Sequence, residues 1–163
     1  MELLNSAGVP GGCRSGPAGP VFLFLFVAAI GVGCGGQLPR PPLAERGGLQ
    51  VLSGYAYPTV GEAGAAYLHI RNSADLPDTL FAVQNEGQSG MLMTTEGTRM
   101  IMVVSATIAP GSEIAMRPGG MHLMFEGLSR PVAVGDTVRL SLRFARAGEL
   151  GVLVPVVAYG EMP

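Results

Sequence analysis

Between residues 51 and 157 the chain alternates between short apolar runs and clusters of turn-forming residues, with no long segment of the 3.6-residue helical period. Turn residues recur about every 8–12 positions, a spacing typical of antiparallel β-sandwiches and barrels. The predicted strands cover residues 65–70, 79–83, 91–93, 100–104, 113–116, 121–125, 137–144 and 151–157. The pattern therefore predicts one all-β domain over residues 51–157, followed by a tail over residues 158–163.

Two methionine-rich segments flank a short polar stretch that is expected to form a hairpin turn. With residues 96–97 as a two-residue turn, Met93 lies directly opposite Met100, and Met91 lies opposite Met102. Side chains alternate along a strand, so the four thioethers share one face. Directly opposed Cβ atoms are roughly 4.5–5.5 Å apart, close enough for two thioethers to reach one ion.

A third methionine-rich segment contains one of the two histidines. Met121, Leu123 and Phe125 alternate along it and are expected to face the core. His122 and Met124 lie between them, so an imidazole and a thioether share the opposite face.

The N-terminal residues 1–33 have the pattern of a signal peptide of the lipoprotein type. Residues 21–30 are entirely apolar, which is too short for a membrane span of about 20 residues but suits a signal-peptide core, and Arg14 precedes them. Cys34 then follows small residues, an arrangement that resembles a bacterial lipobox, although Gly31 stands where leucine is usual. The resemblance implies an exported protein of the periplasm or cell envelope, anchored to the membrane by lipid on Cys34. Ordinary signal-peptidase cleavage and an uncleaved anchor are the alternatives.

Composition limits the chemistry of the exported part. Residues 34–50 are rich in Pro, Gly and polar residues and are predicted to be a tether. The two cysteines are Cys13, in the leader, and Cys34, so an acylated chain has no free thiol and no disulfide. All ten basic residues are arginines without a basic run, and the net charge is −2, so nucleic acid is not an expected partner.

Methionine clustering is the strongest chemical pattern in the chain. Of nine methionines, seven lie between positions 91 and 124: Met91, Met93, Met100, Met102, Met116, Met121 and Met124. Thioethers are soft, neutral ligands that suit copper(I), whereas zinc and hard cations prefer cysteine, histidine or carboxylate. Methionine is also a common filler of cores, and that role is expected for Met91, Met102, Met116 and Met121. His69 is expected to be a solvent-facing strand residue without a metal.

From about residue 55 to 157 the chain resembles the PCu(A)C family of periplasmic copper chaperones. The most specific part is Met-x21-His-x-Met, present as Met100, His122 and Met124. Further similar segments cover residues 65–68, 117–124, 127–131 and 135–138. The resemblance implies a cupredoxin-like β-fold and copper(I) binding by methionine and histidine. It also implies delivery of copper to a copper-accepting protein, such as an oxidase assembly factor or subunit, or to another cuproprotein.

The chain departs from the family at the first ligand, which in the family is a histidine. At the family's spacing from Met100 this chain has Ser89, and the intervening loop is shorter, so that Met93 occupies the histidine's place. The predicted copper ligands are therefore Met93, Met100, His122 and Met124, with loss of the first ligand as the alternative.

Three other functions are alternatives to a copper carrier. An enzyme is not expected, because neither a nucleophile–base arrangement nor a converging carboxylate pair is evident. A blue-copper electron carrier needs a cysteine ligand with two histidines, and Cys34 is in the wrong place. A structural or interaction lipoprotein that keeps the fold without the metal remains the alternative.

Overall fold

The computed structural model describes residues 40–162. The predicted signal peptide over residues 1–33, the lipid attachment at Cys34 and residues 34–39 of the predicted tether lie outside this range. Within the described range there are eleven β-strands and no helix, which confirms the all-β prediction. No helix in that range is therefore long and apolar enough to cross a membrane.

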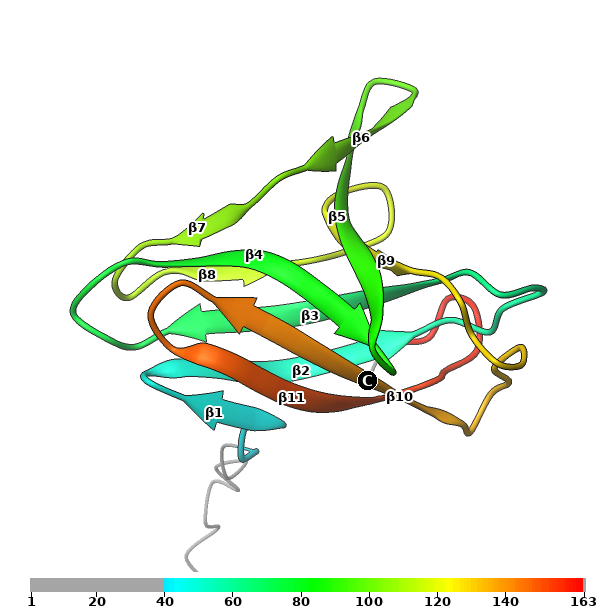
Figure 1. Ribbon diagram of the computed structural model, residues 1–163, viewed down its shortest axis with the longest axis horizontal. Helices are drawn as coiled ribbons and strands as arrows, with labels where there is room; N and C mark the ends of the chain where they lie inside the picture. Colours follow the sequence, from blue (N-terminus) through cyan, green and yellow to red (C-terminus); the bar gives the residue numbers. More distant parts are fainter. Residues whose placement is uncertain (1–39, 163) are drawn as a thin grey trace, which may run out of the picture. The chain divides into compact units, whose positions relative to one another are not determined.

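Most strands are joined by short turns, and the longest connection, residues 126–136, joins the ninth strand to the tenth (Figure 1). In the first half they are β1 (Ala44–Arg46), β2 (Leu49–Ala56), β3 (Gly64–Asn72), β4 (Asp78–Asn85), β5 (Gln88–Glu96) and β6 (Arg99–Val103). In the second half they are β7 (Ala106–Ile108), β8 (Glu113–Ala115), β9 (His122–Phe125), β10 (Thr137–Phe144) and β11 (Gly148–Pro155).

The strands form one antiparallel sheet in the order β1-β2-β3-β9-β5-β4-β10-β11, with β6 paired to β5, β7 to β4 and β8 to β3. The two arms of the sheet meet again at a parallel bridge between Ala56 and Val156, beside which the Val157 amide donates to the Ala56 carbonyl at 3.0 Å. The sheet is therefore nearly closed around its interior. In Figure 1 the β5–β6 hairpin extends away from this closed part.

Alternating residues of each long strand fill the interior. Along β10 the apolar residues Val138, Leu140, Leu142 and Phe144 are all buried, as their period-two pattern predicts. Along β3 the apolar residues Ala66, Leu68 and Ile70 are almost completely buried and fill the interior. Tyr67 and His69 alternate with them and therefore face the other side of the sheet, where other tyrosine rings cover Tyr67.

The predicted tether is wrong at its C-terminal end. β1 pairs with β2 in the register Arg46↔Leu49, joined by Gly47 and Gly48, which have φ values of 58° and 83°. A charged three-residue strand at a sheet edge carries no period-two apolar pattern, and therefore the sequence did not reveal it. The short strand β7, which was also not predicted, pairs with the start of β4.

The turn between β5 and β6 lies one residue later than predicted. Glu96 pairs with Arg99, so the two central residues are Gly97 and Thr98, with φ of 60° at Gly97. A type II′ hairpin turn requires glycine at its first central position. The predicted turn at residues 96–97 would have put Glu96 in that place, where a side chain disfavours positive φ.

Candidate metal centre

Three strands place the soft donors on one face of the sheet. β5 lies between β9 and β6, and Met93 is directly opposite His122 on one side and Met102 on the other. In the next pair along β5, Met91 lies directly opposite Met124. Directly opposed side chains share a face, with Cβ atoms about 4.5–5.5 Å apart. Two thioether pairs and one imidazole therefore converge on the outer face where β6, β5 and β9 run side by side.

The predicted pairing of Met93 with Met100 and of Met91 with Met102 is wrong. Met100 lies opposite Thr95, two residues along the strand from the Met93–Met102 pair. Moving the turn by one residue shifts the partner strand by two positions, which keeps every side chain on its face. The prediction that the four methionines share one face is therefore confirmed, although their partners differ.

The ring of His122 is oriented by a backbone hydrogen bond. Its side chain is 95% removed from solvent, with a residue exposure of 5%, and its Nδ1 lies 2.9 Å from the Gly120 carbonyl oxygen. A carbonyl only accepts, so Nδ1 carries the proton and donates to it. The neutral ring then has its lone pair on Nε2, and a backbone hydrogen bond of this kind is the usual way in which a metal-binding histidine is oriented.

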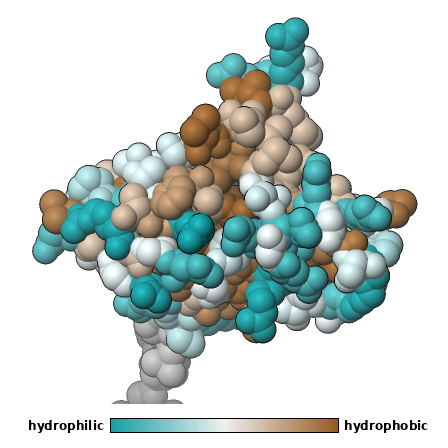
Figure 2. All heavy atoms as spheres, in the orientation of Figure 1, coloured by the Kyte–Doolittle hydropathy of each residue, from teal (hydrophilic) through white to brown (hydrophobic). Residues whose placement is uncertain are grey.

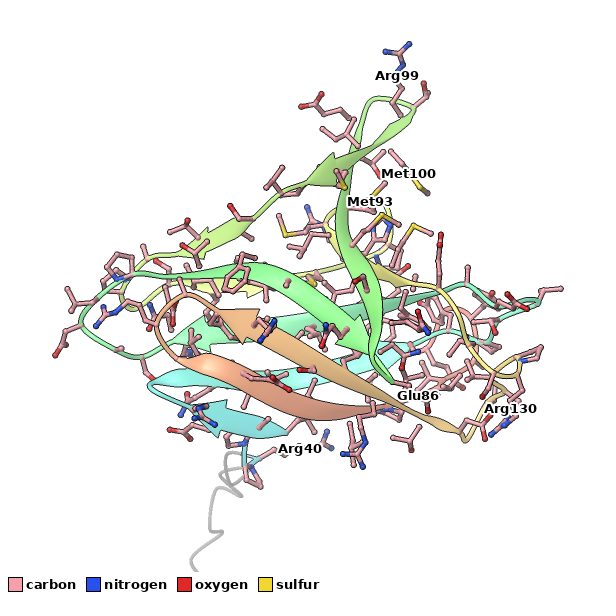
Figure 3. The ribbon with its side chains drawn as sticks, in the orientation of Figure 1. Arg40, Glu86, Met93, Arg99, Met100 and Arg130 are labelled. Carbon is pink, nitrogen blue, oxygen red and sulfur yellow. The ribbon has the colours of Figure 1, made fainter. Side chains whose placement is uncertain are left out.

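The methionines differ widely in exposure. Met93 and Met124 are half-buried, whereas Met100 and Met102 on the hairpin are 64% and 61% exposed. Figure 3 shows Met93 and Met100 on the hairpin, with Arg99 at its tip. The site therefore has an inner part against His122 and an outer part open to solvent.

Apolar surface surrounds the outer part of the site. Val104, at the base of the hairpin, is 80% exposed, and Phe81 on the neighbouring β4 is 50% exposed. In Figure 2 the hairpin forms an apolar projection with a hydrophilic tip. Exposed apolar side chains gathered around soft donors suit contact with another macromolecule better than contact with water.

Gly90 brings the backbones of β5 and β9 together at the site. β5 pairs with β4 as far as Gly90 and with β9 from Met91 onward. A Cβ atom at position 90 would lie 2.8 Å from the Met124 carbonyl oxygen. Only glycine therefore allows this approach, which places Met91 opposite Met124.

All four tyrosines of the chain gather beside His122, which the sequence did not reveal. The rings of Tyr55 and Tyr67 stack at 5.0 Å, Tyr57 packs edge-on to both, and the Tyr67 ring centroid is 6.1 Å from that of His122. Tyr57 also contacts Tyr159, with ring centroids 4.9 Å apart. Tyr67 is thus the member of this cluster that lies beside the imidazole.

Burial governs the ionisation of this cluster. Removal from water, followed by the nearby Tyr57, raises the pKa of Tyr55 to about 12. The same two causes, in the same order, raise the pKa of Tyr67. The Tyr55 hydroxyl is buried and has no hydrogen-bond partner among the described residues. Tyr55 and Tyr67 are therefore uncharged at neutral pH.

The donors gathered on this face are thioethers and one imidazole. Within residues 40–162 no group of three His, Cys, Asp or Glu side chains is placed to hold a metal ion. Three or more thioethers with a neutral imidazole form an uncharged, soft ligand set, which fits copper(I) and does not fit zinc or calcium.

The methionines expected to fill the core fall into two groups. Met116 is buried, and Met121 packs partly buried against the core, as predicted. The prediction is wrong for Met102, which is 61% exposed on the same face as Met93. Met91 is half-buried on that same face, opposite Met124.

His69 lies on the outer face of β3, and its side chain is 35% exposed. Its Nε2 contacts the carboxylate of Glu113, which also pairs with Arg71. The hydrogen bond from Arg71, then that from His69, lowers the pKa of Glu113. His69 is thus part of a surface ion-pair network, and the metal-binding face does not include it.

Comparisons with known proteins agree with this geometry. Residues 49–156, more than half of the chain, match the family described as "Putative lipoprotein LpqE-like". The "Putative lipoprotein Lxx21020" of Leifsonia xyli subsp. xyli is 25% identical over 133 residues, which are 76% of this chain and 80% of that protein.

Solved structures share the fold. The apo PCuAC domain of PmoF2 matches with a TM-score of 0.62 at 24% identity, over 73% of this chain and 97% of that one. The copper-bound PCuAC domain of PmoF2 matches with a TM-score of 0.61 at 26% identity, over 70% of this chain and 96% of that one. The copper(I) form of DR1885 from Deinococcus radiodurans matches with a TM-score of 0.54 at 29% identity, over 78% and 85%.

The nearly closed antiparallel sheet is therefore a cupredoxin-like domain of the PCuAC type, as the sequence resemblance implied. The chain belongs to the family of LpqE-like putative lipoproteins.

Proposed function

We propose that this domain binds one copper(I) ion on the face formed by β6, β5 and β9 and carries it to a copper-accepting protein outside the cytoplasm. The observation that carries the proposal is the direct opposition of Met93 and His122, with Nδ1 of His122 tied to a backbone carbonyl. This arrangement presents a thioether and an available Nε2 to the same ion. Similarity to the copper-bound PCuAC domain of PmoF2 and to copper(I)-DR1885 supports the choice of metal.

The proposed ligands are Met93, Met100, His122 and Met124. Met124 follows His122 by two residues and shares its face, because side chains alternate along β9. Met100 is diagonal to Met93 across the hairpin, where Cβ atoms lie about 7–8 Å apart, within reach of two long thioether side chains. The spacing Met-x21-His-x-Met supports Met100 as the ligand from β6.

A copper(I) titration of the full chain in detergent, against a competing chelator, tests this proposal. The parent is expected to bind one equivalent tightly, and His122→Ala and Met93→Ala are each expected to weaken that binding by at least about tenfold. Met116→Leu is the matched control, because Met116 is buried away from the face. A folded parent that binds no copper(I) would instead support an interaction lipoprotein that keeps the fold without the metal.

The proposed localisation is the cell envelope, with the domain held to the membrane by lipid on Cys34. The supporting observations are the apolar segment before Cys34 and the lipoprotein description of the family and of the Leifsonia relative. Full-length protein expressed in a bacterium is expected to partition into detergent, and Cys34→Ser is expected to abolish this partitioning. Mass spectrometry that finds an unmodified Cys34 in the mature protein would contradict the anchor and leave the copper proposal intact.

A further inference from the structure

Two thioethers on the metal-binding face have no part in the proposed four-ligand site. Met102 lies directly opposite Met93, and Met91 lies directly opposite Met124. Each is therefore about 4.5–5.5 Å, Cβ to Cβ, from a proposed ligand. Two further soft donors thus stand beside the site.

Met91 and Met102 also face a common space. Together with Phe81 and Val104 they line a hollow of about 180 Å³ where the hairpin leaves the rest of the sheet. All the residues that line this hollow are apolar or glycine, so their side chains offer water no hydrogen bonds. The hollow has room for an ion and for one donor group that enters from outside.

Packing does not account for the side chain of Met102. Met102 is 61% exposed, whereas Met116, a methionine that fills the core, is 6% exposed. An exposed methionine contributes little apolar burial, so its thioether is its distinctive property.

We propose that Met91 and Met102 form a second, outer copper(I) position, completed by a donor from the protein that gives or receives the ion. This inference rests on the proposed function of the inner site. The step is a ligand exchange: copper forms bonds to the sulfurs of Met91 and Met102 and to the donor of the other protein, while its bonds to the four inner ligands break. Copper stays in the +1 state, and no proton or electron is consumed.

An outer position of this kind has properties that separate it from the inner one. Thioethers carry no proton to lose, so copper(I) binding there is independent of pH, and two neutral sulfurs do not suit copper(II) or zinc. With two protein ligands in place of four, its affinity is lower than that of the inner site.

The test uses the full chain with ¹³C-methyl-labelled methionine, titrated with copper(I) in a non-coordinating buffer. The first equivalent is expected to shift the methyl signals of Met93 and Met124. A second equivalent, bound at least about tenfold more weakly, is expected to shift those of Met91 and Met102. The double variant Met91→Leu, Met102→Leu is expected to bind no second equivalent, and its affinity for the first equivalent is expected to stay within about twofold of the parent's. It is also expected to release copper to a chelator about tenfold more slowly.

Met116→Leu combined with Met121→Leu provides the control, because neither residue lies on the metal-binding face. His122→Ala is expected to weaken the binding of the first copper(I) equivalent and to leave the binding of the second unchanged. The outer position is refuted, and the inner site stands, if three results are found together. The parent binds one equivalent, excess copper does not shift its Met91 and Met102 signals, and the double variant releases copper at the rate of the parent. If no equivalent binds at all, the proposed function itself fails.

Discussion

Met93 lies directly opposite His122 in the β5–β9 pair, and this pairing places a thioether where the family resemblance implied a second imidazole. The position is set by backbone pairing, so the side chain at residue 93 must meet the imidazole whatever its identity. A thioether at that point makes the ligand set softer than one with two histidines. The metal preference of the site should therefore depend on residue 93 more than on any other position.

Met93→His is expected to raise copper(II) affinity by at least about tenfold, with a smaller change for copper(I), because imidazole suits copper(II) and thioether does not. Copper(II) titration followed by its visible absorption and electron paramagnetic resonance would measure the gain. Thr94→His is the matched control, since Thr94 pairs with Ile101 and faces the other side of β5. A gain from Thr94→His and none from Met93→His would show that the proposed face is wrong.

Gly90→Ala should damage the site without removing a donor. The added Cβ would meet the Met124 carbonyl at 2.8 Å, so β5 and β9 must separate, at a cost of about 1–3 kcal/mol in the free energy of unfolding. Copper(I) affinity should fall in parallel. Gly151→Ala on β11, whose Cβ would meet nothing within 4 Å, should change stability by less than about 0.5 kcal/mol. If both variants had the same stability and the same copper(I) affinity, the close approach at Gly90 would not be required for the site.

Asp78 is expected to be a main anchor of the fold. Its buried carboxylate accepts the backbone amides of Thr79, Arg146 and Ala147 at 2.7, 2.9 and 2.8 Å, which ties the start of β4 to the β10–β11 turn. Asp78→Ala leaves these amides without an acceptor and should cost at least about 2 kcal/mol, measured by chemical denaturation. Asp75→Ala, at an exposed position on the preceding turn, should cost almost nothing.

Tyr55→Phe should affect the stability of the domain differently at neutral and at alkaline pH. Burial raises the pKa of Tyr55 from 10.0 to about 12, so its contribution to stability is complete below pH 10 and is lost as the pH rises through 12. At pH 7 the variant should be as stable as the parent or more so, because it removes a buried hydroxyl without a partner. Between pH 10 and 12 the variant should lose less stability than the parent.

Melting temperatures across this pH range would test the alkaline prediction, with Tyr159→Phe as the control because its side chain is 71% exposed. An identical alkaline loss in the parent and in Tyr55→Phe would assign that loss to another group.

Local pattern was sufficient for the fold class and for the shared face of the donors. Period-two alternation, as in β10, depends only on which residues are apolar, so strands and their buried faces follow from the sequence. The same alternation put Met91, Met93, Met100 and Met102 on one face, and this result survives any register shift by an even number of residues. His122 and Met124 share a face for the same reason.

Which donor meets which was decided only in the tertiary structure. Turn position, set by the positive φ of Gly97, moved Met100 away from Met93 and brought Met102 opposite it. The insertion of β5 between β6 and β9 joined residues 93 and 122, which are far apart in the chain. Long-range strand order has no local pattern, because it depends on backbone hydrogen bonds between strands and on close approaches such as that of Gly90 to Met124. The aromatic neighbour of His122 was also decided there: Tyr55 and Tyr67 face each other only because β2 pairs with β3, and Tyr67 meets the imidazole only because β3 pairs with β9.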